Sequence, residues 1–361
     1  MIPVSLCMIV KNEQEQIGQC LKSVAPYLQE IIVVDTGSND ATKDIAKDFT
    51  TNIYDFSWNN SFSEARNYSI LKATNPMILV MDSDEMLDHA SLAFLAEFCG
   101  RQDHSAGRVK LVNQTSDSST ITEIVRIFPN DGNHFYSGRI HEQLMLRDGK
   151  TPTTCSTNIR IFHSGYTQEQ MNAKNKLKRN IELLLFESKE NPLNPYIWYQ
   201  LGKTHYVNKS YSEAASCLQY AIDLLAKSQN MPPYVPNLLV QYAHTLIKLR
   251  NFQLLFSVLE TGLDLYPDFT DIYFIYGTAL MELQDVKYLD RIRELFEACL
   301  ALGEANPSDY ESVTGVGSFK ASYNLGVYYE TMGNYDKAIS YYELSAQSGY
   351  PLAIHRLALL K

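Results

Sequence analysis

The sequence predicts an α/β domain with a mostly parallel sheet, followed by an all-α domain of helical repeats. Residues 1–90 alternate between short apolar runs and segments in which apolar residues recur at helical spacing. That alternation is typical of parallel strands joined by right-handed helical crossovers. From about residue 168 onward the spacing is helical throughout, and the pattern repeats itself. We therefore predict a first domain at 1–166, a connecting helix at 167–195 and a repeat domain at 196–361.

Composition excludes several classes of protein. The chain has 361 residues and a formal net charge of −10, which argues against a protein that binds nucleic acid through a cationic surface. No apolar run approaches the about 20 residues that a membrane helix needs, so we expect no membrane span. The N-terminus lacks the basic region and cleavage site of a signal peptide, and the six cysteines form no CxxC pair. We therefore expect a cytoplasmic protein with reduced, structural cysteines.

Polar side chains follow the strands of the first domain at the ends where ligands bind in such sheets. Asn12, Asp35 and Asp82 each lie at or just beyond the carboxyl end of an expected strand, so three segments bring polar groups to one edge. Ser61 and Glu64 have the spacing of a helix-capping box. The expected strands are 4–10, 30–35, 52–56 and 77–82, and the expected helices are 13–28, the latter part of 36–49, and 61–74.

Residues 106–165 have a different pattern. Strand-like runs at 121–128 and 134–144 flank the turn-forming stretch "PNDGN", and another run at 158–166 contains a histidine. We expect an antiparallel extension of the sheet that covers the edge where the polar residues gather.

The stretch "MDSDE" contains candidate ligands for a metal ion. In an extended segment the side chains of Asp82 and Asp84 point the same way, and two aligned carboxylates suit Mg²⁺ or Mn²⁺ shared with substrate phosphates. The alternative is that these residues only end a strand and cap a helix. Asp35 either caps its helix or accepts the imide N–H of a uracil. Arg66 is either an ordinary surface arginine or a contact to a nucleobase carbonyl or a phosphate.

The second half of the chain contains a repeated pattern of aromatic, apolar and small residues. Trp198, Leu201 and Gly202 open one unit, and Leu325 and Gly326 occupy the same offsets in another. Ala243 and Gly277 are one period of about 34 residues apart, so the pattern resembles tetratricopeptide repeats. The alternative is a generic helical bundle.

The motifs of the first domain, taken in order, resemble the GT-A glycosyltransferases of family 2, whose domain is Rossmann-like. This resemblance rests on "SLCMIVKNE", "IIVVDTGSNDAT", "FSEARN" and "VMDSDE". More narrowly, "FYSGRIHEQL", "FHSGY", "KLKRNIELL" and the repeats resemble sublancin-type peptide S-glycosyltransferases, which pair a GT-A domain with a tetratricopeptide region. That subfamily carries an additional N-terminal segment that is not part of this sequence.

The resemblance implies roles for the matched residues. Four of them would hold the uridine part of a nucleotide-sugar donor: Asn12, Glu13, Asp35 and Arg66. Asp82 would face the ribose and diphosphate. Asp84 and His163 would ligate a divalent cation, Mn²⁺ or Mg²⁺.

Glu142 is the candidate general base, because inverting transfer needs a group that takes the proton of the attacking acceptor. His141 is the alternative base, or a hydrogen-bonding group for the donor. The two do not belong to an HExxH motif, which argues against a zinc protease. Candidate phosphate contacts are Arg126, Arg139, Lys178 and Arg179.

Together with these residues, the resemblance implies a metal-dependent, inverting glycosyltransferase of the hexosyltransferase type. The expected donor is a UDP-sugar or another nucleotide sugar, and the expected acceptor is a Cys, Ser or Thr side chain of a peptide or protein. The alternatives are a transferase acting on a cell-envelope glycan and a tetratricopeptide adaptor with an inactive GT-A domain. The last segment, "YPLAIHRLALLK", leaves an apolar end on the repeats, so we expect a homodimer through residues 190–361. The alternative is a monomer in which this last helix itself caps the repeats.

Overall fold

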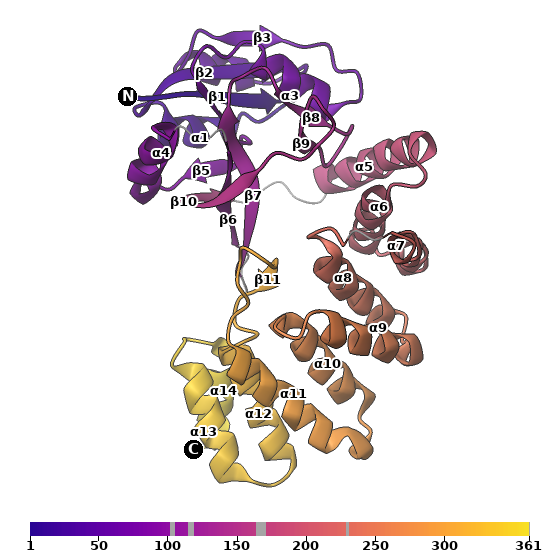
Figure 1. Ribbon diagram of the computed structural model, residues 1–361. Helices are drawn as coiled ribbons and strands as arrows, with labels where there is room; N and C mark the ends of the chain where they lie inside the picture. Colours follow the sequence, from indigo (N-terminus) through magenta and orange to yellow (C-terminus); the bar gives the residue numbers. More distant parts are fainter. Residues whose placement is uncertain (102–104, 115–118, 164–170, 229–230, 361) are drawn as a thin grey trace. The chain divides into compact units, whose positions relative to one another are not determined.

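The chain folds into two compact units, which are described separately (Figure 1). The computed structural model describes residues 1–101, 105–114, 119–163, 171–228 and 231–360. The first unit is Met1–Pro192 and the second is Leu193–Lys361. The division therefore falls after the long helix α5 (Met171–Glu190), which belongs to the first unit.

The first unit is built on a mixed sheet with the strand order β3-β2-β1-β4-β7-β6-β10-β5. The strands β3, β2, β1 and β4 pair in parallel, as predicted for the first part of the chain. Strand β7 is antiparallel to both β4 and β6, as expected for the region from residue 106 onward. The expectation fails for β10, which pairs in parallel with β6. The bounds are β1 (Ile2–Val10), β2 (Leu28–Asp35), β3 (Ile53–Asp55), β4 (Met77–Val80), β5 (Glu85–Leu87), β6 (Ala106–Gln114), β7 (Ser119–Pro129) and β10 (Thr154–His163).

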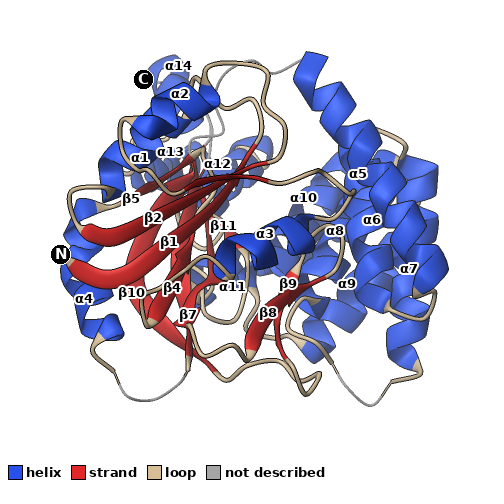
Figure 2. Ribbon diagram, turned by 90° about the horizontal axis from the view of Figure 1, so that it is seen from above, coloured by secondary structure: helices blue, strands red, loops and turns tan. Residues whose placement is uncertain are grey.

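Both faces of the sheet are covered, which explains why its first strands are continuously apolar. Leu6 and Met8 of β1 pack on the face of α1, α2 and α4, while Cys7 packs on the face of α3 (Figure 2). The bounds are α1 (Ile17–Val24), α2 (Thr42–Lys47), α3 (Phe62–Ile70), a short 3-10 helix (His89–Ser91) and α4 (Leu92–Cys99). Ser61 caps α3 as predicted, since its Oγ accepts the backbone N–H of Glu64 at 3.3 Å.

The prediction of one strand at 134–144 was wrong. The structure has a separate hairpin of β8 (His134–Ser137) and β9 (Gln143–Leu146), joined by a turn. Gly138 and His141 adopt positive φ angles of 98° and 52° in this turn, which is incompatible with a continuous strand. Of the run predicted at 158–166, residues 164–166 lie outside the described residues, as do residues 167–170 of the connecting segment.

The second unit is a series of paired helices, and its close helix contacts agree with the predicted repeats. A Cβ at Gly326 would lie 2.5 Å from the ring of Tyr342, and one at Gly277 would lie 2.7 Å from Phe296, so each glycine lets two helices approach. The bounds are α6 (Pro195–Val207), α7 (Tyr211–Ala226), α8 (Val235–Lys248), α9 (Phe252–Leu265), α10 (Thr270–Leu283), a short 3-10 helix (Val286–Tyr288), α11 (Leu289–Leu302), β11 (Ser312–Val313), α12 (Phe319–Thr331), α13 (Tyr335–Ala346) and α14 (Pro351–Leu360).

Two expectations about the whole chain can be compared with the structure. All six cysteines are free thiols. Among the helices that the structure describes, none is long and apolar enough to cross a bilayer.

Candidate active site

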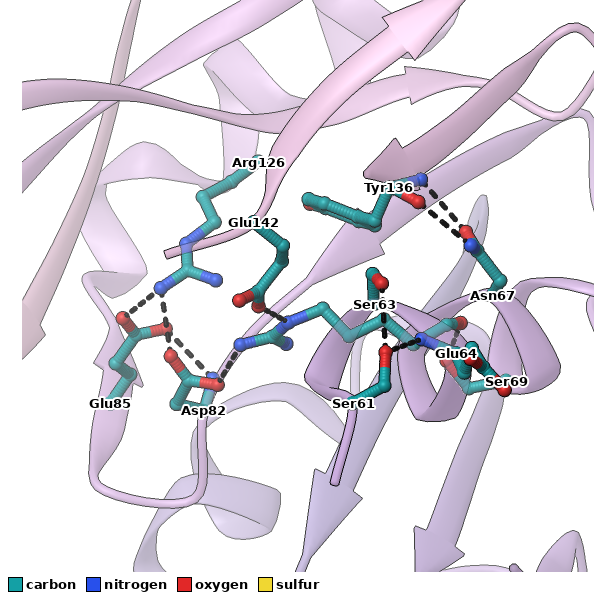
Figure 3. A network of polar contacts seen from close by, with 11 residues as sticks. Ser61, Ser63, Glu64, Asn67, Ser69, Asp82, Glu85, Arg126, Tyr136 and Glu142 are labelled. Carbon is teal, nitrogen blue, oxygen red and sulfur yellow. Dashed lines mark hydrogen bonds and ion pairs between the residues drawn. The ribbon is translucent and has the colours of Figure 1, made fainter. Parts of the chain in front are cut away.

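Arg66 forms the centre of a network of buried ion pairs at the carboxyl edge of the sheet (Figure 3). Helix α3 carries this residue, which is only 7% exposed. Its Nη2 donates to Oδ1 of Asp82 at 2.7 Å, and its Nε donates to the carboxylate of Glu142. One guanidinium therefore joins the end of β4 to the hairpin turn, two segments that both contain predicted site residues.

Arg126 holds the other side of Asp82. From β7, its Nη2 lies 2.8 Å from Oδ2 of Asp82 and 2.8 Å from Oε1 of Glu85. Oε2 of Glu85 accepts the backbone N–H of Asp82 at 2.9 Å, which closes the turn after β4. Figure 3 shows Asp82 and Glu85 converging with Arg126 and Glu142. Glu85 is therefore part of the framework of the network, and its side chain is only 2% exposed.

The two arginines keep Asp82 ionised. Burial raises the pKa of Asp82, but Arg66 and Arg126 outweigh it and hold the pKa of this carboxyl well below its usual range. Burial raises the pKa of Glu85 to about 7, with Arg126 opposing the shift. Asp82 therefore stays negatively charged within the network. Its side chain is 34% exposed and can contact a ligand.

Three buried donors of this network have no hydrogen-bond partner among the described residues. They are Nη1 of Arg66, Nε of Arg126 and the hydroxyl of Tyr136. Tyr136 lies beneath Arg66, whose Cζ is 5.8 Å from the ring centroid, and Asn67 fixes its backbone through two hydrogen bonds of 2.8 Å. Unpaired buried donors carry a cost, which the oxygens of a ligand or an ordered water would remove.

Asp84 and His163 meet beside this network. Oδ2 of Asp84 lies 3.1 Å from Nε2 of His163, and Nδ1 of His163 lies 2.9 Å from Oδ1 of Asn113. The strand pairing brings Asp84 and His163 together, because His163 at the end of β10 pairs with Glu85 on β5. The hydrogen bond to the carboxylate of Asp84 raises the pKa of His163, and burial opposes the shift.

Carboxylate and imidazole are suitable ligands for Mn²⁺, and Asn113 orients the imidazole as a supporting residue would. Within the described part of the chain, no group of three or more His, Cys, Asp or Glu side chains is arranged to hold a metal ion. Asp84 and His163 are therefore a pair of candidate ligands, and water and substrate phosphates would have to supply the remaining ligands of the metal ion.

Of the four residues predicted to hold the uridine, Asn12, Glu13 and Asp35 lie at or just beyond the ends of β1 and β2, whereas Arg66 lies on α3 in the network described above. Oδ2 of Asp35 accepts the backbone N–H groups of Gly37 and Ser38 at 3.0 and 2.9 Å. Oδ1 of Asn12 accepts the N–H of Asn39 at 2.8 Å, and the N–H of Glu13 donates to Thr42 at 2.7 Å. These bonds connect the two strand ends. Since β4 is the other neighbour of β1, the end of β1 lies about 5 Å and the end of β2 about 10 Å along the sheet from the end of β4, which Asp82 follows.

One oxygen of Asp35 remains unused. Asp35 is 2% exposed, and its Oδ1 is buried with no hydrogen-bond partner among the described residues. A buried carboxylate oxygen without a donor is unfavourable, so a ligand N–H at this position would be well bound.

Other predicted residues lie away from the network. Arg139 lies in the hairpin turn, and its guanidinium contacts helix α5, with Nε and Nη2 at 3.3 and 3.4 Å from the carboxylate of Glu190. Lys178 is exposed on α5, where Glu182 lies 4.0 Å away. Arg179 lies over the ring of Phe62 at 5.1 Å. His141 is exposed in the hairpin turn, beside the partly buried Glu142.

Sequence reasoning missed the partners that hold these residues in place. Glu85 is given no role by the sequence beyond its place at the end of "MDSDE", and Arg126 is only one of several candidate phosphate contacts. Tyr136 and Asn67 were not considered. The only sequence signal for Glu85 was its position three residues after Asp82, which suits a side-chain bond to the Asp82 N–H.

Comparison with known proteins gives results for both units. The family model "Glycosyl transferase family 2" matches residues 5–169, and the tetratricopeptide repeat model matches residues 319–347. The chain is 29% identical over 296 residues to the SPbeta prophage-derived glycosyltransferase SunS of Bacillus subtilis, covering 78% of this chain and 68% of that protein.

Two further relatives match a smaller share of the chain. A TPR repeat-containing protein of Synechococcus elongatus, Synpcc7942_0270, is 30% identical over 56% of this chain and 52% of its own length. The solved structure of the TPR protein YrrB covers 52% of this chain and 86% of its own, at 21% identity and a TM-score of 0.39.

Proposed function

Since the N-terminal unit is a family 2 glycosyltransferase domain and the second unit contains tetratricopeptide repeats, we propose a specific transfer reaction for this glycosyltransferase. The reaction moves a sugar from a nucleotide sugar to a side chain of a peptide or protein, with inversion at the anomeric carbon. The proposed donor is a UDP-sugar. The observation that carries this proposal is the network in which Arg66 joins Asp82 to Glu142.

The nucleotide is assigned to the ends of β1 and β2. The unpaired Oδ1 of Asp35 is an acceptor for the imide N–H of uracil, which is an N–H that cytosine lacks. Asn12 and Glu13 lie on the neighbouring segment, where the backbone N–H groups of both residues and the side chain of Asn12 hold the loop that follows Asp35. This arrangement supports a preference for uridine over cytidine nucleotides.

The diphosphate is assigned to the edge between Asp82 and Asp84. A divalent cation, Mn²⁺ or Mg²⁺, would be held by Asp84 and His163 and would neutralise the charge of the leaving diphosphate. Asp82 remains ionised and partly exposed, which suits a contact to the ribose hydroxyls. Arg66 and Arg126 orient Asp82 and offset its charge in the protein.

Glu142 is the proposed general base. The carboxylate lies at the junction of the hairpin turn and the network, where Arg66 fixes one of its oxygens and leaves the other for an acceptor proton. His141 is the neighbouring alternative. Its side chain is exposed, whereas Glu142 is held toward the carboxyl edge of the sheet.

The second unit is proposed to dock the acceptor and to form a homodimer. Arrays of helical repeats present extended surfaces that suit extended peptides. The last helix leaves Leu352 and Leu359 52% and 62% exposed, and these residues share one face. A two-fold contact between two copies would bury this face. The six free thiols agree with a reducing compartment, so we assign the reaction to the cytoplasm.

A thermal-shift panel tests the donor assignment. Ligands that bind only the folded state raise the melting temperature by mass action. We expect a shift with UDP and UDP-sugars that grows with Mn²⁺, and a smaller shift with CDP. A panel in which no nucleotide raises the melting temperature, with or without Mn²⁺, would contradict the proposal. Asp35→Asn should reduce the preference for UDP over CDP, because the amide offers a weaker acceptor to the imide N–H.

A further inference from the structure

The residue proposed as the general base lies in a hairpin that is separate from the main sheet. Glu142 ends the turn between β8 and β9, and among the described strands these two pair only with each other. The hairpin packs on the sheet through Tyr136 and Leu144, which are 6% and 7% exposed. Apolar packing is non-directional, so it holds the hairpin against the sheet without fixing where Glu142 lies. Fixing the place of Glu142 requires directional contacts.

Asn67 of α3 supplies two directional contacts, and both go to one residue of the hairpin (Figure 3). Its Nδ2 donates to the carbonyl oxygen of Tyr136 at 2.8 Å, and its Oδ1 accepts the N–H of Tyr136 at 2.8 Å. A side-chain amide carries both a donor and an acceptor, so Asn67 bonds β8 as a neighbouring strand would. Two bonds to one residue fix its orientation as well as its distance from α3.

Helix α3 holds the hairpin at two further points. The backbone N–H of Phe62, at the start of the helix, donates to the carbonyl oxygen of Arg139 at 2.8 Å. The guanidinium of Arg66 bonds the carboxylate of Glu142. All three contacts come from α3, whose geometry fixes the spacing between them. Asn67 therefore holds the backbone of the hairpin on the same helix that holds the side chain of Glu142.

Helix α5 contacts the same turn. A Cβ at Gly138 would lie 3.4 Å from Oε1 of Glu187, which α5 carries. Burial raises the pKa of Glu187, and the backbone N–H groups of Arg139 and Ile140, which face this carboxylate, oppose the shift. The turn keeps these contacts when Asn67 is replaced. We therefore expect the loss of the Asn67 bonds to displace the turn and not to unfold the hairpin.

We infer that Asn67 is a positioning residue for Glu142 and sets the place of this carboxylate through the backbone of β8. The inference rests on the proposed function, because it takes Glu142 to be the general base. A base must lie within hydrogen-bond reach of the proton that it takes, and a misplacement of about 1 Å can lower a rate about 10²-fold. The described side-chain bonds of Asn67 both go to Tyr136, so Asn67 acts on Glu142 through the hairpin.

Steady-state kinetics of sugar transfer by the full chain test this inference. We expect Asn67→Ala to lower kcat about tenfold or more and to leave KM for the UDP-sugar unchanged, because the strand ends that would hold the nucleotide do not move. In a Glu142→Gln chain the same substitution should cause no further loss, since the displaced side chain no longer acts as a base. Asn67→Gln keeps both hydrogen-bonding groups and should retain more of kcat than Asn67→Ala.

Asn130→Ala is the matched control. Nδ2 of Asn130 donates to the carbonyl oxygens of Ala73 and Asn75 at 3.1 and 2.9 Å, at the end of the sheet where β4 begins. This variant also loses two side-chain bonds to the backbone, so its melting temperature should fall by a similar amount while kcat is unchanged. An equal loss of kcat in Asn130→Ala and Asn67→Ala would show general loosening of the fold and would overturn the inference.

Two other kinetic results would also overturn the inference: a change confined to KM, or an equal fold-loss from Asn67→Ala with and without Glu142→Gln. Hydrogen exchange separates these failures from a failure of the proposed function. The amide of Phe62 has no partner within its own helix, so its protection depends on the carbonyl of Arg139. Asn67→Ala should make this amide exchange at least about threefold faster, and Asn130→Ala should leave it unchanged.

The exchange result holds whether or not sugar is transferred. A chain that transfers no sugar from any nucleotide sugar contradicts the proposed reaction, and the amide of Phe62 then decides whether Asn67 sets the place of the turn. Faster exchange in Asn67→Ala supports that placement. Unchanged exchange shows that Asn67 does not position the turn, and it overturns the inference even if the unmodified chain is an active transferase.

Discussion

Nε2 of His163 lies 3.1 Å from Oδ2 of Asp84, although 79 positions separate the two residues in the sequence. The antiparallel pairing of β10 with β5 creates this contact, since it places His163 opposite Glu85. Strand β10 thus places the imidazole of His163 at the edge of the sheet where Asp82 and Asp84 follow β4. The proposed cation site depends on this pairing, and so does the first prediction.

Asp84→Asn should abolish metal-dependent turnover of the donor while the protein stays folded. Removing one of few charged ligands sharply weakens a site for a hard cation. Isothermal titration with Mn²⁺ in the presence of UDP would measure the loss, and circular dichroism would confirm folding. Asp48→Asn, at an exposed position after α2, is the matched control and should behave as the unmodified chain. Normal metal binding by Asp84→Asn would rule out this cation site.

Arg66→Met should lower the free energy of unfolding by about 3 kcal/mol. The substitution leaves the partly buried Glu142 without its cation, whereas Asp82 is 34% exposed and keeps its ion pair with Arg126. The expected loss is therefore at the lower end of the range for a broken buried ion pair. Urea denaturation followed by circular dichroism would measure it. Adding Glu142→Gln to Arg66→Met should recover part of the loss, because a neutral amide needs no counter-charge. Strict additivity of the two losses would contradict the described pairing.

The sequence was sufficient where the signal is local. The apolar runs predicted the first four strands and their order along the chain, and Ser61 with Glu64 predicted the start of α3. The repeat pattern placed Gly326 at the same offset as Gly202 in a helical repeat, and the structure has two helices in close contact at both glycines. These features depend on residues a few positions apart, and periodicity reports such relationships directly.

The sequence was insufficient where the chemistry joins distant segments. Arg66 could have been a surface residue, and only the fold shows that it is buried between Asp82 and Glu142. The hairpin turn was missed because the residues around Gly138 and His141 have strand-like composition, and their positive φ angles leave no periodic signature. The partners of Asp82 come from α3 and β7, which periodicity cannot place relative to each other.

Gly326→Ala should destabilise the second unit, although alanine is the better helix former. The new Cβ would lie 2.5 Å from the ring of Tyr342, and overpacking of this kind costs about 1–3 kcal/mol, against a gain of about 1 kcal/mol in helix propensity. Thermal unfolding would measure the net loss. Gly18→Ala in α1 is the matched control, since its nearest contact is 3.4 Å from Ile45 and it should be neutral or stabilising. A stabilised Gly326→Ala would show that the helices are not in close contact there.

Leu359→Glu should convert a dimer into a monomer. The side chain is 62% exposed on the last helix, and a charge in the proposed contact would have to be buried without a partner. Light scattering during size exclusion would give the mass of each variant. Leu71→Glu changes a leucine that is 76% exposed in the first unit, and it should leave the dimer intact. A monomeric unmodified chain, or a dimer that survives Leu359→Glu, would contradict the assignment of this surface.

The most direct test of the central claim is mass spectrometry of a Cys- and Ser-containing acceptor peptide after incubation with UDP-glucose or another UDP-hexose and Mn²⁺. The account predicts that the unmodified chain adds the mass of one hexose. Glu142→Gln should cut this transfer by about 10²-fold or more, the usual scale for loss of a general base, while UDP binding is unchanged. His141→Ala should retain transfer. Full transfer by Glu142→Gln together with an inactive His141→Ala would contradict the proposed base, and no transfer or donor hydrolysis with any nucleotide sugar would contradict the proposed reaction.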